Sequence, residues 1–158
     1  MKKIIVFMSI MAIMSCRSNA QENKEEKNYP VTKTEAEWKA ELTSLQYYVL
    51  REAGTERAFS SSLDKNYEKG VYVCAACETP LFRSENKFDS GSGWPSFDRE
   101  IEGNVAFSTD YKIGYARTEE HCANCGGHLG HVFNDGPRKT TGMRHCINGA
   151  ALEFVPEN

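Results

Sequence analysis

The stretch CANCGGHLGHVF, residues 122–133, gives the clearest indication of the fold. It begins with a C-x-x-C pair, continues into two glycines that favour a tight turn, and ends in branched and aromatic side chains typical of a β-strand. A second pair, Cys74 and Cys77, lies upstream, with 44 residues between the pairs. Two such turns brought together present four thiolates tetrahedrally, the geometry of a structural zinc site. Cys74, Cys77, Cys122 and Cys125 are therefore the expected ligands of one Zn²⁺ per chain.

Two other uses of these cysteines are open from the sequence. In an oxidising compartment four cysteines could form two disulfides. A single C-x-x-C can also be a redox pair, which requires a helix N-terminus after a buried strand. The residues that follow Cys77 and Cys125 are turn-like, with a Glu-Thr-Pro and a Gly-Gly sequence, and argue against redox use.

The chain beyond Gly70 is typical of an antiparallel β domain. Short runs of β-branched and aromatic residues alternate with breaks rich in Gly, Asn and Asp. The fold class predicted is mainly β with short N-terminal helices. The predicted strands are 71–73, 105–107, 111–115, 131–133 and 152–155.

Two short helices are expected before these strands. Thr34 and Glu37 fit a capping box, and the helix that follows should bury Trp38 and Leu42. A second helix is expected over 45–52, closed by a glycine at position 54 in the C-cap position.

The first residues of the chain have the character of an export signal. Lys2 and Lys3 precede an apolar run of eleven residues, which is too short to span a bilayer. The run ends in Ile-Met-Ser-Cys, which resembles a bacterial lipobox and implies lipidation of Cys16. The expected organisation is a lipoprotein-type signal peptide over 1–16, a polar tether over 17–29 and one folded domain over 30–156. A plain signal peptide and an uncleaved anchor are the alternatives.

The charge of the mature chain excludes one class of partner. Without Lys2 and Lys3, 17 basic and 22 acidic side chains remain. An acidic chain does not favour nucleic-acid binding, and no basic amphipathic stretch suggests docking on anionic lipid. We therefore expect an exported bacterial cell-envelope lipoprotein that faces the periplasm and contacts the membrane only through its lipid.

Cys146 remains once the expected zinc ligands and Cys16 are set aside. A spare thiol in an exported protein is often reactive, and a buried structural cysteine is the alternative. Arg144 and His145 precede it directly, and a nearby cation lowers the pKa of a thiol and raises its thiolate fraction. These neighbours favour a nucleophilic role.

Over about residues 33–155 the chain resembles the B-type methionine sulfoxide reductases. The resemblance rests on LREAGTER at 50–57, GSGWPSF at 91–97, HLGHVF at 128–133 and RHCIN at 144–148, together with the C-x-x-C pairs. It implies reduction of the R epimer of methionine sulfoxide, mainly in oxidised proteins, in protein repair and defence against oxidative stress. It also implies two antiparallel sheets around one core.

The resemblance gives each matching residue a role. Cys146 would be the nucleophile and His131 the acid, with His128 hydrogen-bonding or sharing that role. A histidine suits the task because a sulfoxide sulfur becomes electrophilic once its oxygen is protonated, and imidazole titrates near neutrality. Arg144 would stabilise the thiolate, and Asn148 would orient water or a histidine. Without the resemblance, the His-x-x-His pair could be half of a metal site.

The substrate would contact three aromatic residues. Trp94 offers a flat apolar face for the S-methyl group, a contact worth about 0.3–1.5 kcal/mol. Phe97 ends the segment GSGWPSF and Phe133 ends HLGHVF. Both rings would complete the apolar surface around the substrate. The product would be methionine and a sulfenic acid on Cys146.

Position 92 departs from the pattern. Many members of this family have a resolving cysteine there, whereas this chain has Ser92. Because serine cannot form a disulfide with Cys146, the resemblance implies regeneration by an external thiol such as a thioredoxin-like protein. Two other classes of function stay open: a thiol–disulfide oxidoreductase that uses Cys122 and Cys125, and a zinc-stabilised module that only binds oxidised methionine.

Overall fold

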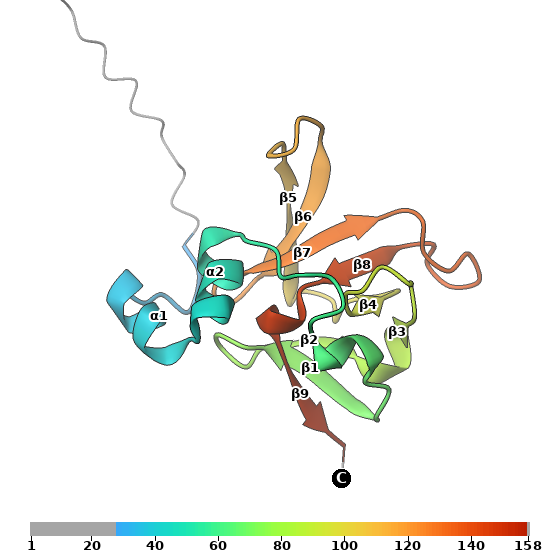
Figure 1. Cartoon of the computed structure of the whole chain (residues 1–158), viewed down its shortest axis with the longest axis horizontal. Coiled ribbons are helices and arrows are strands. Elements are labelled where there is room, and N and C mark those ends of the chain that lie inside the picture. The colour runs from blue at the N-terminus through green and yellow to red at the C-terminus, as the bar shows by residue number, and fades with distance from the viewer. Residues whose placement is uncertain (1–27, 158) are drawn as a thin grey trace, which may run out of the picture.

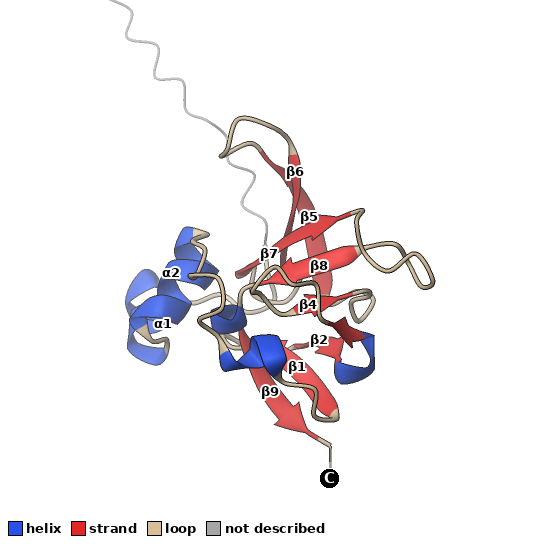
Figure 2. Ribbon diagram, turned by 45° about the vertical axis from the view of Figure 1, so that its right-hand side comes forward, coloured by secondary structure: helices blue, strands red, loops and turns tan. Residues whose placement is uncertain are grey.

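The computed structural model describes residues 28–157, which form two antiparallel sheets with two short helices beside them (Figure 1, Figure 2). The mainly β prediction is confirmed. The predicted signal peptide, 1–16, and the tether up to residue 27 lie outside the described residues. Within the described part, no helix is long and apolar enough to cross a membrane.

The larger sheet contains the candidate site. Its strand order is β3-β4-β8-β7-β6-β5, and every neighbouring pair is antiparallel. The strands are β3 (Lys87–Phe88), β4 (Ser96–Phe97), β5 (Val105–Asp110), β6 (Arg117–Cys122), β7 (His128–Phe133) and β8 (Arg144–Ile147).

The smaller sheet has the order β2-β1-β9 and joins the first strand of the chain to the last. Its strands are β1 (Gly70–Cys74), β2 (Pro80–Arg83) and β9 (Leu152–Pro156). Three short 3₁₀ turns connect the elements: η1 (Ser62–Lys65), η2 (Ser84–Asn86) and η3 (Gly149–Ala151).

An aromatic cluster lies at the centre of the core that the sheets share. The rings of Phe82 and Phe97 stack with centroids 4.4 Å apart, and Tyr72 meets Phe97 edge-on at 5.0 Å. All three side chains have 0% exposure, as do Leu129 and Ile147 on the strands that form the site. The face of the larger sheet that contains the candidate site therefore rests on a closely packed apolar layer.

Helix α1 (Glu35–Glu41) begins as predicted. Thr34 accepts a hydrogen bond from the backbone of Glu37, and the Glu37 side chain accepts one from the backbone of Thr34, so the capping box is complete. Trp38 and Leu42 are buried, as expected.

Helix α2 (Ser44–Glu52) ends at the predicted residue, but its C-cap differs from the one expected. Ala53, not Gly54, has the left-handed conformation, with φ 50° and ψ 44°. Gly54 is needed for a different reason: a Cβ there would lie 2.3 Å from the ring of Tyr48. The glycine therefore permits close packing at the end of the helix rather than its reversal.

The predicted strand over 111–115 is wrong. This segment is the tip of the hairpin between β5 and β6, which projects from the body of the sheet (Figure 1). Gly114 at its turn has φ 88°, a conformation that disfavours other residues. The strand lies in the next segment, β6, which the sequence reading omitted because its residues Arg-Thr-Glu-Glu-His-Cys are mostly polar.

Candidate active site

Strand pairing brings the predicted nucleophile and acid together. Cys146 lies on β8, opposite Ser96 of β4 and His131 of β7. Residues directly opposite in an antiparallel pair present their side chains on the same face. The thiol and the imidazole are therefore neighbours, although they lie 15 positions apart in the sequence.

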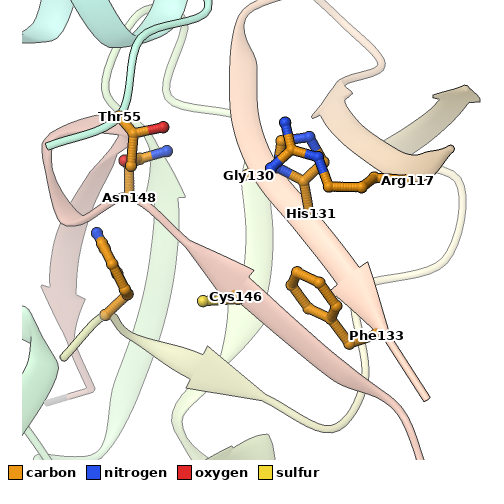
Figure 3. A pocket seen from close by; sticks show the side chains of 8 residues that line it. Thr55, Arg117, Gly130, His131, Phe133, Cys146 and Asn148 are labelled. Carbon is orange, nitrogen blue, oxygen red and sulfur yellow. The ribbon is translucent and has the colours of Figure 1, made fainter. Parts of the chain in front are cut away.

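Cys146 opens into a pocket with a volume of about 130 Å³ (Figure 3). Five of the predicted site residues line it, and His128, Arg144 and Phe97 do not. The lining residues are Thr55, Trp94, Arg117, Gly130, His131, Phe133, Cys146 and Asn148.

His131 is held by a carboxylate. Its Nε2 lies 2.8 Å from Oδ2 of Asp110, and Arg117 donates to the same oxygen at 2.5 Å. Burial lowers the pKa of His131 below its ordinary value, and the bond to Asp110 opposes this shift. The pKa of Asp110 itself is well below its usual range, because the backbone N–H of Lys112, His131 and Arg117 all donate to its carboxylate. Near neutral pH, His131 is therefore neutral and faces a permanent carboxylate.

Asp110 and Arg117 are functional candidates that the sequence reading missed. They pair directly across β5 and β6, as the last strand pair before the turn of the projecting hairpin. Reading 111–115 as a hairpin turn would have brought them opposite one another, and an acid facing a base across a strand pair is a favourable arrangement. The bonds of Asp110 to Arg117 and to His131 fix the orientation of the imidazole.

His128 has a different place. Its Nδ1 lies 2.6 Å from Oε1 of Glu119, and Oε2 of the same carboxylate accepts a hydrogen bond from Ser108 at 3.0 Å. The bond from His128 lowers the pKa of Glu119 to about 2. The ring of His128 meets that of His131 edge-on at 5.5 Å. His128 therefore supports His131 from behind and does not face Cys146 in the pocket.

Arg144 reaches the thiol from its own strand. Asp135 accepts two hydrogen bonds from its guanidinium, at 2.9 and 3.0 Å, and the guanidinium lies 4.4 Å from the ring centre of Phe133. Burial raises the pKa of Cys146 above its ordinary value, while Ser92 and Arg144 lower it in part. The net shift is opposite to the one expected from the neighbouring cations. Cys146 is therefore a thiol at rest, not a thiolate.

His145 does not act on the thiol as its place in the sequence suggested. It follows the alternation of β8 to the opposite face, where its Nδ1 lies 2.6 Å from Glu120 and its Nε2 lies 3.2 Å from Glu100. Glu120 has 0% exposure, and burial raises its pKa. The contact between His145 and Glu120 joins β8 to β6 on the face of the sheet opposite the site.

Asn148 joins the pocket to the loop after α2. Its side chain accepts a hydrogen bond from the backbone N–H of Glu56 at 2.9 Å and donates one to the carbonyl of Leu129 at 2.9 Å. The carbonyl of Glu56 in turn accepts from the indole N–H of Trp94 at 3.2 Å. Glu56, which the sequence reading did not single out, thus connects Asn148 and Trp94.

Phe97 does not line the pocket. Its side chain has 0% exposure and stacks on Phe82 in the core. Successive residues of a strand face opposite sides, so Ser96 faces the site and Phe97 must face the interior. A direct contact with substrate is therefore ruled out by its position, and Phe97 supports β4 from below.

The four cysteines of the C-x-x-C pairs form one cluster that could hold a metal ion. Their sulfurs all lie within 4.8 Å of one another. Among the described residues no cysteine forms a disulfide. Glu78 and Gly126, which directly follow the two pairs, both have positive φ, at 57° and 71°. Each pair therefore makes the same tight turn around a common centre.

Comparison with known proteins identifies the family of the chain. Residues 42–156 match the model of the SelR domain. The chain is 56% identical to the peptide methionine sulfoxide reductase MsrB of Leptospira interrogans serogroup Icterohaemorrhagiae serovar Lai over 131 residues, 82% of this chain and 99% of that protein. It is 53% identical to MsrB of Agrobacterium fabrum over 80% of this chain and 93% of that protein, and 50% identical to MsrB of Burkholderia multivorans over 85% and 96%. The chain therefore belongs to the SelR-domain family of MsrB-type peptide methionine sulfoxide reductases.

Proposed function

We propose that the protein reduces the R epimer of methionine sulfoxide to methionine, mainly in oxidised polypeptides, as a peptide-methionine (R)-S-oxide reductase. One observation carries the proposal: a single pocket brings the thiol of Cys146 together with His131 and the apolar rings of Trp94 and Phe133. Thiol chemistry and protein repair are general for the family.

The protonation states indicate how the reaction begins. Cys146 starts as a thiol and His131 as a neutral imidazole whose Nε2 donates to Asp110, so Nδ1 is free to take a proton. Transfer from the thiol to Nδ1 gives a thiolate and an imidazolium, and Asp110 stabilises the imidazolium. The thiolate attacks the sulfoxide sulfur while the imidazolium protonates its oxygen. The hydroxyl then moves from the methionine sulfur to the Cys146 sulfur as the new S–S bond breaks, which releases methionine and leaves a sulfenic acid on Cys146.

Separated R and S sulfoxides test the activity. With dithiothreitol as reductant, the R epimer of a methionine sulfoxide peptide should be converted to methionine and the S epimer should persist. Chromatography of the peptide gives both rates in one reaction. Equal reduction of the epimers, or binding of the R epimer without turnover, would contradict the proposal.

We propose that the cysteine cluster holds one structural Zn²⁺. Zinc–sulfur bonds of about 2.3 Å in a tetrahedron separate the sulfurs by about 3.8 Å. Cys74 and Cys125 have their sulfurs 3.7 Å apart, and Cys77 and Cys122 have theirs 3.6 Å apart. Because four protein ligands complete a tetrahedral shell, this ion would stabilise the fold and take no part in catalysis.

Replacing a ligand should release the metal and lower the melting temperature. Structural zinc contributes about 10–16 kcal/mol in small metal-dependent peptides, and a domain with its own core depends on it only in part. Cys125→Ser should therefore lose zinc by elemental analysis and melt at a lower temperature. Cys146→Ser is the matched control and should keep both. Unchanged melting of a metal-free Cys125→Ser protein would contradict a stabilising role.

We propose that an external thiol, such as a thioredoxin-like protein, regenerates Cys146. The Ser92 hydroxyl lies 3.8 Å from the sulfur of Cys146, so a cysteine at position 92 would be within reach of it. Because serine cannot form a disulfide, Cys146 cannot be regenerated through an intramolecular disulfide with position 92.

One turnover without reductant should therefore leave a sulfenic acid. Dimedone should label Cys146 after reaction with one equivalent of substrate, and intact mass should increase by one oxygen. The Ser92→Cys variant should instead lose two hydrogens and resist dimedone. A wild-type disulfide between Cys146 and a cluster cysteine would overturn both this route and the zinc proposal.

We propose that Cys16 is lipidated and anchors the protein in the bacterial cell envelope, facing the periplasm. The basic residues, the apolar run and the Ile-Met-Ser-Cys sequence support this, and all of them lie outside the described residues. The polar residues 17–29 would connect the lipidated Cys16 to the folded domain. Wild-type protein should fractionate with membranes and Cys16→Ala should not; identical fractionation would contradict the anchor.

A further inference from the structure

Three serine hydroxyls form a continuous chain that ends at the sulfur of Cys146. Ser92 Oγ lies 3.8 Å from Sγ, and Ser90 Oγ lies 2.7 Å from Ser92 Oγ and 2.7 Å from Ser96 Oγ. Ser96 Oγ lies 3.0 Å from the carbonyl oxygen of Trp94. The chain follows the loop before β4 and lies beside β8, because Ser96 is the strand partner of Cys146.

A hydroxyl chain has a direction, since each hydroxyl has only one hydrogen to donate. When Cys146 is a thiol, it can donate to Ser92, Ser92 to Ser90, and Ser90 to Ser96. Ser96 then donates to the carbonyl of Trp94, a hydrogen bond with good geometry. Every hydrogen of the chain has an acceptor in this direction.

The same atoms can be satisfied in the opposite direction. When Cys146 is a thiolate it can only accept, so Ser92 donates to the sulfur, Ser90 to Ser92, and Ser96 to Ser90. Each hydroxyl keeps its own hydrogen and rotates about its C–O bond, so no proton moves along the chain.

Ser90 is suited to both directions. A serine hydroxyl has one donor and two acceptor positions. The backbone N–H of Ser92 donates to Ser90 Oγ at 3.3 Å and fills one acceptor position in either direction. The other acceptor position receives the hydroxyl of Ser92 in the thiol direction and that of Ser96 in the thiolate direction.

We propose that Ser92, with Ser90 and Ser96 behind it, is a reversible hydrogen-bond donor that stabilises the ionised sulfur of Cys146 during attack on substrate. The proposal rests on the proposed function only in taking Cys146 as the nucleophile. Ser92 touches the reacting sulfur and is a catalytic residue, whereas Ser90 and Ser96 are positioning residues. The serine at position 92 thus has a positive role besides the absence of a resolving thiol.

Other charged groups also act on this sulfur and define the background against which the chain is tested. Arg144 on the same strand favours the thiolate, and Glu120 on β6 opposes it. His131 on β7 is the partner that takes the thiol proton, and Asp110 holds it in place. Substitutions at Ser92 and Ser90 leave all four groups unchanged.

The test is the pH dependence of alkylation of Cys146 by iodoacetamide in the full folded domain without substrate. Mass spectrometry of the Cys146 peptide separates this reaction from any at the cluster cysteines. A hydrogen bond to a charged group is worth roughly one pH unit or more, so Ser92→Ala should move the midpoint upward by about one unit. Alkylation near neutral pH should slow by about tenfold, and the limiting rate at high pH should not change. Ser90→Ala should shift the midpoint in the same direction by less.

Two controls separate the chain from a general effect on folding. Ser92→Thr keeps the hydroxyl and should retain the wild-type midpoint. Ser84→Ala removes a serine acceptor for the backbone N–H of Gly70, near the smaller sheet, and should also retain it. An unchanged midpoint in Ser92→Ala, or a shift in Ser92→Ala with none in Ser90→Ala, would overturn the proposal. Alkylation needs no turnover, so failure of the chain and failure of the reductase activity are distinguishable.

Discussion

Cys146→Ser is expected to abolish reduction of the R-sulfoxide, with a loss of more than about 10⁴-fold in turnover. A serine hydroxyl in the same place cannot ionise to a comparable nucleophile, and it cannot form a sulfenic acid. The substitution changes one atom on a strand that is paired on both sides, so the fold should be retained.

Single-turnover formation of methionine measures this loss without involvement of the regenerating thiol. Zinc content and circular dichroism should equal those of the wild type, because Cys146 is separate from the cluster cysteines. Methionine formation above a trace in this variant would remove Cys146 from its role.

His131→Ala should lower kcat by about 10²–10⁴-fold, the usual range for loss of a general acid. His131 lines the pocket with Cys146, and Asp110 stabilises its charged form. The wild-type rate should fall below the pKa of His131, which burial lowers, and above the pKa of Cys146, which burial raises. The acid limb should disappear in the variant, since the imidazole that must start neutral is gone.

His128→Ala is the matched control for this assignment. It removes a neighbouring imidazole that is bound to Glu119 but does not line the pocket with Cys146. Its loss of kcat should be the smaller of the two. A larger loss in His128→Ala would show that the roles of the two histidines are reversed.

Local signals in the sequence predicted the parts of the fold that depend on neighbours along the chain. The capping box of Thr34 and Glu37 needs only residues three positions apart, and the structure confirms it. The C-x-x-C turns are equally local. Four cysteines with this spacing are typical of one tetrahedral metal site, and the structure brings their sulfurs together as expected. The hydrophobic pattern did not predict strand β6, because most of its residues are polar. One of them, Glu120, is nevertheless fully buried against His145 of β8.

The sequence predicted residues of the site, but not which residues the pairing of the strands places opposite one another. The resemblance pointed to Cys146 and His131, which the structure places in one pocket, but Asp110 and Arg117 became visible only through the pairing of β5 with β6. Phe97 was misplaced because a motif gives the order of residues and not the face on which each lies. The direction of the pKa shift of Cys146 was also missed, since burial is a property of the packed structure.

The metal ion proposed for the cysteine cluster would also affect how the chain folds. Cys74 at the end of β1 pairs with Leu152 at the start of β9, 78 positions later in the sequence. A metal ion that joins Cys74 to Cys125 reduces this separation to 27 positions along the chain. The entropy of loop closure grows with the logarithm of length, so the shorter path makes this pairing easier by about 1 kcal/mol. The proposed ion, if bound early, would lower the effective contact order of the smaller sheet, and the chain would then fold faster than the same chain without metal.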